Sequence, residues 1–145
     1  GTGSKDSWEK ITLASTIGGM VINTAGVTLA HGMEHPASGL KDIVHGKGLA
    51  ALTPTIIESS YQGAPEKFAK LAKLFGGEKA EDLAGKVREL LEAIELTCTL
   101  SDLGIEEKDI PWMAENCMKV SAPSIANNPV VFSLEEIAEI YKKAL

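Results

Sequence analysis

Apolar residues in the second half of the chain recur every three or four positions, the spacing of one face of an α-helix. One such segment begins at Pro65 and ends at Gly76-Gly77, the order in which proline and glycine flank helices. A longer segment keeps the same spacing from about Ala80 to Cys98, and Gly104 follows as a natural stop. The pattern therefore predicts two helices in this part of the chain.

Two further helices are predicted nearer the C-terminus. The residues from Glu106 to Cys117 again show helical spacing, and Ser133 stands three positions before Glu136, which predicts a capping box. No stretch alternates apolar and polar residues for long enough to indicate a strand. We therefore predict an all-α protein, a multi-helix bundle of about five to seven helices.

The first half of the chain is rich in glycine. Nine of the 14 glycines fall in the first 48 residues, although each glycine inside a helix costs up to about 1 kcal/mol. Close packing of helices, a ligand approached by the backbone and reversals of the chain would each explain this density. The sequence leaves these explanations open.

The composition limits the classes of function. A chain of 145 residues with 44% hydrophobic residues can form one domain with a core, here 1–145, in which residues 1–4 resemble a linker or a cloning remnant. The net charge of −6, the lack of a Lys/Arg cluster and the 5% of aromatic residues argue against nucleic acid and membrane partners. Two cysteines, Cys98 and Cys117, favour a reducing cytoplasm and are expected to be small buried residues rather than nucleophiles.

The three histidines of the chain, His31, His35 and His45, lie within fifteen residues of one another. His31 and His35 are four positions apart and so share one face of a helix, a common way to offer two imidazoles to one metal. Pro36 is expected to end that helix, Gly39 to reverse the chain, and His45 to reach the same space from a loop before the next helix. The cluster indicates a metal or catalytic site, with ordinary surface or capping histidines as the alternative.

The segment from His31 to His35 also matches H-x-x-E-H, the inverted zinc-protease signature, in which Glu34 would be the general base. So short a pattern often occurs by chance. A proline directly after the second histidine does not suit a helix that carries both ligands. We therefore expect Glu34 to be a solvated or structural carboxylate.

The wider context of the histidines is more specific. The segments concerned are 26–36, His45-Gly46 followed by Leu49, Ala50 and Pro54, 104–110, Asn127-Asn128-Pro129 and 134–141. Together these segments closely resemble the iron-containing alcohol dehydrogenase family. The resemblance implies the helical C-terminal domain of the dehydroquinate synthase-like fold. It also implies an oxidoreductase that interconverts alcohols with aldehydes or ketones.

The resemblance assigns a role to each histidine. His31 and His45 match the positions that bind the divalent metal, usually Fe²⁺ and sometimes Zn²⁺. His35 matches the histidine near the nicotinamide of NAD or NADP, which has been given a proton-relay role. The implied metal ligands are therefore His31 and His45, and His35 is the implied catalytic and cofactor-side residue.

Some parts of the family pattern do not occur in this sequence. Family members carry an N-terminal nucleotide-binding domain with a glycine-rich loop, and take two more metal ligands from an Asp-x-x-x-His helix; neither is found here. We therefore expect a fragment that is inactive alone, from an intact enzyme that acts on a small alcohol or aldehyde and is compatible with a homodimer. A free-standing helical metal-binding module, or a degenerate non-catalytic one, is the alternative.

Overall fold

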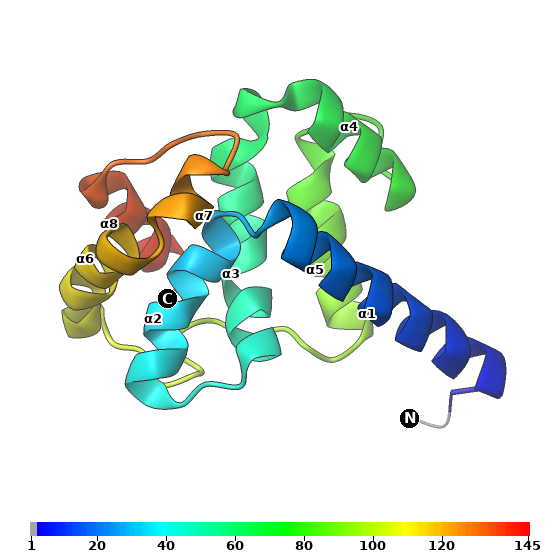
Figure 1. Cartoon of the computed structure of the whole chain (residues 1–145), viewed down its shortest axis with the longest axis horizontal. Coiled ribbons are helices and arrows are strands. Elements are labelled where there is room, and N and C mark those ends of the chain that lie inside the picture. Colours follow the sequence, from blue (N-terminus) through cyan, green and yellow to red (C-terminus); the bar gives the residue numbers. More distant parts are fainter. Residues whose placement is uncertain (1–2) are drawn as a thin grey trace.

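The computed structural model describes residues 3–145, which form helices and no strand (Figure 1). The α-helices are α1 (Lys5–Ala25), α2 (Leu29–Lys41), α3 (His45–Ser60), α4 (Pro65–Leu74), α5 (Asp82–Ala93), α6 (Ile110–Val120), α7 (Ala122–Ala126) and α8 (Leu134–Lys143), with 3₁₀ turns at Tyr61–Gly63 and Glu107–Asp109. The all-α prediction is confirmed. The described residues contain one helix more than the upper end of the predicted range, because α7, with 5 residues, is too short to show helical periodicity.

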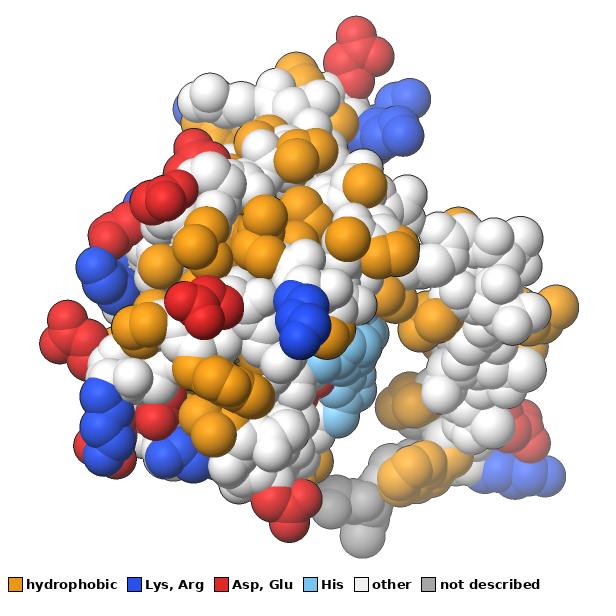
Figure 2. Space-filling model, turned by 60° about the vertical axis from the view of Figure 1, so that its left-hand side comes forward, with side chains coloured by type: hydrophobic (Ala, Val, Ile, Leu, Met, Phe, Trp, Pro, Cys, Tyr) orange, Lys and Arg blue, Asp and Glu red, His pale blue; other side chains and the backbone are white. Residues whose placement is uncertain are grey.

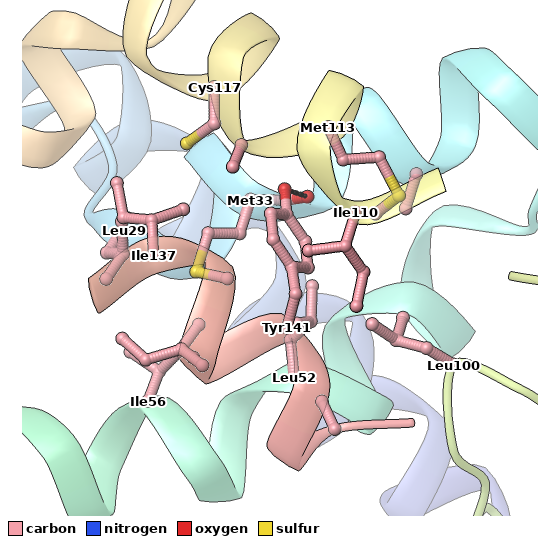
Figure 3. Packing of buried hydrophobic residues seen from close by; sticks show 14 of the residues in the cluster. Leu29, Met33, Leu52, Ile56, Leu100, Ile110, Met113, Cys117, Ile137 and Tyr141 are labelled. Atoms are coloured by element: carbon pink, nitrogen blue, oxygen red, sulfur yellow. Dashed lines mark hydrogen bonds between the residues drawn. The ribbon is translucent and has the colours of Figure 1, made fainter. Parts of the chain in front are cut away.

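Helix α2 lies at the centre of the fold and packs against α3, α6 and α7. Its Leu29 and Met33 are fully buried, and the fully buried Tyr141 of α8 reaches toward them (Figure 3). The core is completed by residues from four parts of the chain: Leu52, Ile56, Leu100, Ile110, Met113, Cys117 and Ile137. Any site on α2 is therefore held in place by a helix that is tightly packed into the core.

The predicted helix boundaries in the second half hold in most places. Helix α4 begins at Pro65 and is followed by Gly76, whose φ of 81° lies in the left-handed region. At the start of α8 the capping box forms in both directions: Ser133 Oγ accepts from the Glu136 N–H, and the Glu136 carboxylate accepts from the Ser133 N–H. The helix predicted from 106 is present as a 3₁₀ turn that continues into α6.

The helix predicted to reach Cys98 is wrong at its end, because α5 stops at Ala93. Glu95 takes a left-handed conformation, with φ of 56°. Its N–H donates to the carbonyl of Glu92, and the N–H of Leu96 donates to the carbonyl of Leu91. These two bonds form a Schellman motif, which usually has glycine where Glu95 stands.

The prediction that Pro36 ends its helix is also wrong, because α2 continues through Pro36 to Lys41. A proline inside a helix leaves the carbonyl four residues earlier without its usual donor. Here that carbonyl belongs to Gly32, and it accepts from the Ser121 hydroxyl at 3.2 Å. The chain consequently reverses after α2 at Asp42, with φ of 52°, and not at Gly39, which lies inside the helix.

Glycine at position 32 allows α2 and α7 to approach closely. A Cβ atom there would lie 3.1 Å from the Cβ of Ser121 and 3.2 Å from that of Ser124, which is tighter than ordinary van der Waals contact. Close helix packing therefore explains this glycine. A second glycine, Gly48 of α3, has a similar role beside the histidine cluster and is described below.

Helix α1 projects from the rest of the molecule and has no buried residue (Figure 1). Asn127 fixes its C-terminal end, because the Asn127 amide donates to the carbonyls of Ala25 and Val27 at 3.0 and 3.3 Å. Of the expected linker 1–4, residues 1–2 lie outside the described residues, and Ser4 caps α1 by accepting from the Ser7 N–H.

No single helix within residues 3–145 is both long and apolar enough to cross a membrane. Helices α1 and α2 meet the length and composition criterion only when they are taken together, and they are bent by 101° at the break between them.

Candidate metal centre

Two neighbouring helices bring the three histidines together. His31 and His35 lie one turn apart on α2, and His45 is the first residue of α3 rather than part of the loop where it was expected. The ring centroids of His31 and His45 are 5.2 Å apart, those of His35 and His45 are 5.9 Å apart, and those of His31 and His35 are 6.1 Å apart. The spacing in the sequence therefore did identify residues that meet in space.

The histidines lie at the edge of the helical body and face the hollow between it and α1 (Figure 2). His35 and His45 are exposed, whereas His31 is partly buried. Burial lowers the pKa of His31 below its ordinary value, and the nearby imidazoles of His45 and His35 lower it further, while Glu34 raises it. A neutral imidazole has a free lone pair, which is the form that binds a metal.

Glu34 was expected to be a solvated or structural carboxylate, and the structure excludes the solvated form. Its side chain is fully buried. One carboxylate oxygen lies 2.5 Å from Nδ1 of His45, and the other accepts from the Ser38 hydroxyl. Both oxygens are thus engaged with protein groups, which does not suit a general base that must activate water in a zinc-protease site.

Sequence reasoning missed the contact between Glu34 and His45. The two residues are separated by eleven positions and lie on different helices. A signal was present in Gly48, because a Cβ there would lie 2.8 Å from Cγ of Glu34. Without the fold, however, nothing connects a glycine in one helix with a glutamate in another.

The residues of this cluster fit a divalent metal. Among the described residues, donor atoms of Glu34, His35 and His45 all lie within 4.8 Å of one another. Two ligand atoms on a tetrahedral Zn²⁺ would be about 3.4 Å apart, given metal–nitrogen bonds of about 2.1 Å. The donor atoms are therefore close to the spacing that one metal would need, and both imidazoles of the set lie at the exposed surface. His31 is not in this set, although its ring is the nearest neighbour of the His45 ring.

The two cysteines lie outside the cluster. Cys117 is fully buried in the core, and burial raises the pKa of its thiol to about 12. Cys98 is partly buried, and burial also raises the pKa of its thiol. Raised pKa values keep both thiols protonated near pH 7, which fits the expectation that neither is a nucleophile.

The helical fold and the histidine motif both point to one family. The C-terminal region of the Fe-containing alcohol dehydrogenase family matches residues 3–145 of the chain. The chain belongs to this family. Its helices thus correspond to the C-terminal domain of the iron-containing alcohol dehydrogenases, as the sequence motif predicted.

The relatives of the chain include several alcohol dehydrogenases. It is 33% identical to 1,3-propanediol dehydrogenase of Klebsiella pneumoniae over 144 residues, which cover 94% of this chain and 37% of the relative. It is 28% identical to lactaldehyde reductase of Escherichia coli K12 over 150 residues, which cover 98% of this chain and 39% of the relative. The chain therefore spans less than two fifths of the length of these curated relatives.

Solved structures agree with the sequence comparison. An archaeal halo-thermophilic alcohol dehydrogenase from a Red Sea brine pool matches with a TM-score of 0.87 and 33% identity, over 94% of this chain and 37% of the other. The iron-containing alcohol dehydrogenase of Thermococcus thioreducens matches with a TM-score of 0.86 and 30% identity, over 98% of this chain and 38% of the other. The helical arrangement is therefore that of the iron-containing alcohol dehydrogenases.

Proposed function

We propose that this chain supplies two metal ligands and a proton-relay histidine to the active site of an NAD(P)-dependent alcohol dehydrogenase. His31 and His45 are the proposed ligands of Fe²⁺ or Zn²⁺, and His35 is the proposed relay. The observation that carries the proposal is the meeting of three imidazoles, with ring centroids 5.2 to 6.1 Å apart, in a chain of the iron-containing alcohol dehydrogenase family.

The proposed chemistry is reversible hydride transfer between a small alcohol and a nicotinamide cofactor. A divalent metal, when bound, supplies Lewis acidity toward the alcohol oxygen, and the cofactor carries the redox step. His31 supports this role because its lowered pKa favours the neutral imidazole, the form that can bind a metal. His35, exposed and one turn away, can accept the released proton and pass it to water.

The remainder of the proposal concerns the intact enzyme. The substrate class is a small alcohol or aldehyde, which is supported by the relatives named as 1,3-propanediol dehydrogenase and lactaldehyde reductase. The nucleotide-binding domain and the remaining metal ligands belong to a part of the enzyme beyond this chain, and the isolated chain is inactive. We further propose that the enzyme is cytoplasmic and can form a homodimer. The two free cysteines are consistent with a reducing compartment.

Variants of the enzyme that carries this chain test the roles of the histidines. His31→Ala and His45→Ala should each deplete bound metal, since each removes a ligand. His35→Ala should keep the metal and lower turnover by about 10²- to 10⁴-fold, the usual contribution of a proton-relay group. The metal content and the steady-state rates of the variants distinguish the ligand role from the relay role. Lys70→Ala, at an exposed position of α4, is the control. If His35→Ala lost metal as completely as the other two, His35 would be a ligand and the relay assignment would be wrong.

A second candidate is a free-standing metal-binding module. It is favoured by one observation, namely that Glu34, His35 and His45 bring three donor groups together without any other part of an enzyme. Under the main proposal, this chain alone offers too few ligands and should be purified largely without Fe²⁺ or Zn²⁺. Stoichiometric metal that survives dialysis against a mild chelator would instead support the free-standing module.

A further inference from the structure

Glu34 is the only acidic side chain of the described residues that is buried in the core. A buried carboxylate is costly unless hydrogen bonds compensate for the lost water. Both oxygens have such partners, Nδ1 of His45 for one and the Ser38 hydroxyl for the other. A carboxylate held in this way beside a proposed metal ligand needs an explanation beyond packing.

The contact with His45 determines which ring nitrogen is free. A neutral imidazole carries its proton on only one nitrogen, and the hydrogen bond of one nitrogen sets the role of the other. An ionised carboxylate can only accept a hydrogen bond, so a hydrogen bond between the Glu34 oxygen and Nδ1, which are 2.5 Å apart, requires Nδ1 to carry the proton. The lone pair is then on Nε2, the ring nitrogen not bonded to Glu34.

We propose that Glu34 is a positioning residue, which holds His45 in the Nδ1–H tautomer and in the ring orientation that leaves Nε2 free for the metal. This inference rests on the proposed function, since it assigns His45 as a ligand. Metal-bound histidines commonly donate their second ring N–H to a carboxylate, which orients the ring and makes it a better ligand. In this chain the carboxylate comes from the helix that carries the other two histidines.

The surroundings of Glu34 hold its carboxylate in place. The Ser38 hydroxyl, one helical turn after Glu34, lies against the carboxylate and also 3.0 Å from the carbonyl of Ile43. This serine therefore connects Glu34 to the loop that leads into His45. On the other side, Gly48 provides the space for the carboxylate, because a Cβ at that position would lie 2.8 Å from Oε1.

The competing role for Glu34 is that of a direct ligand together with His35 and His45. The donor atoms of these three residues are close enough to share a metal. However, the carboxylate is fully buried while the His35 and His45 rings are exposed, and the oxygen nearest to His45 is already engaged by its Nδ1. The experiments below separate the two roles.

The first experiment measures the tautomer of His45 in the metal-free chain by long-range ¹H–¹⁵N NMR. The pH is held at about 8.5, about two units above the pKa of free histidine. We expect a protonated Nδ1 in the wild-type chain and a change toward protonated Nε2 in Glu34→Ala. Glu115→Ala, which removes an acidic residue from α6, should leave the tautomer unchanged. An unchanged His45 tautomer in Glu34→Ala would overturn the proposal.

The second experiment measures Zn²⁺ affinity in the enzyme that carries this chain. Glu34→Ala should weaken Zn²⁺ binding by about 10- to 100-fold, as is usual for loss of a group that orients a ligand. Glu34→Gln, which keeps the shape and one acceptor oxygen, should recover most of the affinity. Loss of Zn²⁺ in Glu34→Gln as complete as in His45→Ala would mean that Glu34 is a direct ligand.

Failure of the positioning role and failure of the proposed function give different results. If His31→Ala and His45→Ala both kept their Zn²⁺, the proposed function would be wrong, whatever the tautomer. If Glu34→Ala did not fold, Ser38→Ala would replace it in both measurements, with a smaller change in the same direction expected. In that case, no change in either measurement for Ser38→Ala would overturn the positioning role.

Discussion

Tyr141 places its hydroxyl group in the middle of the core, where its O–H donates to the carbonyl of Met33 at 2.6 Å. Burial raises the pKa of Tyr141 far above its ordinary value, so the phenol stays protonated and remains a donor. Met33 lies on α2 between His31 and His35. A single hydrogen bond therefore connects the C-terminal helix to the helix that carries two of the histidines.

Replacing Tyr141 with phenylalanine removes this bond and keeps the aromatic ring. We expect Tyr141→Phe to lower the free energy of unfolding by about 1 kcal/mol, the usual net value of a buried hydrogen bond. Tyr61→Phe is the matched control, because the Tyr61 hydroxyl makes only an exposed 3.4 Å contact with Gln62. The free energy of unfolding of Tyr61→Phe should differ from that of the wild type by no more than about 0.5 kcal/mol. Urea denaturation of the three proteins measures both values, and equal losses would contradict the prediction.

The grouping of the three histidines could be predicted from the sequence, whereas the contact between Glu34 and His45 could not. His31 and His35 were identifiable because a helix places positions four apart on the same face. The burial of Glu34 could not be identified in the same way. The sequence does not show which side of the helix a glutamate between two histidines faces until the partner helix is known. The roles assigned to the three histidines remain predictions.

At the level of the helices, local rules predicted the beginnings better than the ends. Pro65 and Ser133 act within a single turn, so their effects are visible in the sequence. The end of α5 depends on Glu95 adopting a conformation that glycine usually takes, which composition does not reveal. The continuation of α2 through Pro36 depends on Ser121, which is 89 residues away from the carbonyl that it contacts.

The Ser121 hydroxyl can be tested as the replacement for the donor that Pro36 lacks. Ser121→Ala should lower the free energy of unfolding by about 1–3 kcal/mol, because it leaves a buried carbonyl without a partner. In a Pro36→Ala background the loss should be smaller, since an alanine N–H can donate to the Gly32 carbonyl within the helix. Urea denaturation of the wild type, both single variants and the double variant gives the coupling. The same loss in both backgrounds would contradict this explanation.

For the whole molecule, the periodicity of apolar residues was sufficient to predict the all-α class, but not how the helices are placed. Packing decides the placement, and the sequence does not show which apolar faces meet. Helix α1 is the clearest case, because its apolar residues suggest burial whereas none of them is buried in the structure. Its exposed large apolar residues are Trp8, Ile11, Leu13, Ile17, Met20, Val21 and Ile22.

A helix that buries none of its side chains should open easily. We expect the backbone amides of α1 to exchange with deuterium orders of magnitude faster than those of α2 in the isolated chain, because isolated helices are only marginally stable in water. Hydrogen–deuterium exchange read out by mass spectrometry compares the two helices in one sample. Protection of α1 equal to that of α2 would show that its apolar face is covered in solution.

The exposure of α1 also makes the chain suitable for optical measurements. The chain has two tryptophans, Trp8 on α1 and Trp112 on α6, and their exposed fractions are 57% and 47%. Both indoles are therefore expected to emit at the long wavelengths typical of water. In Trp112→Phe the remaining tryptophan fluorescence would come from α1 alone. A shift of that emission to shorter wavelength would then show, without an attached dye, that another surface has covered this helix.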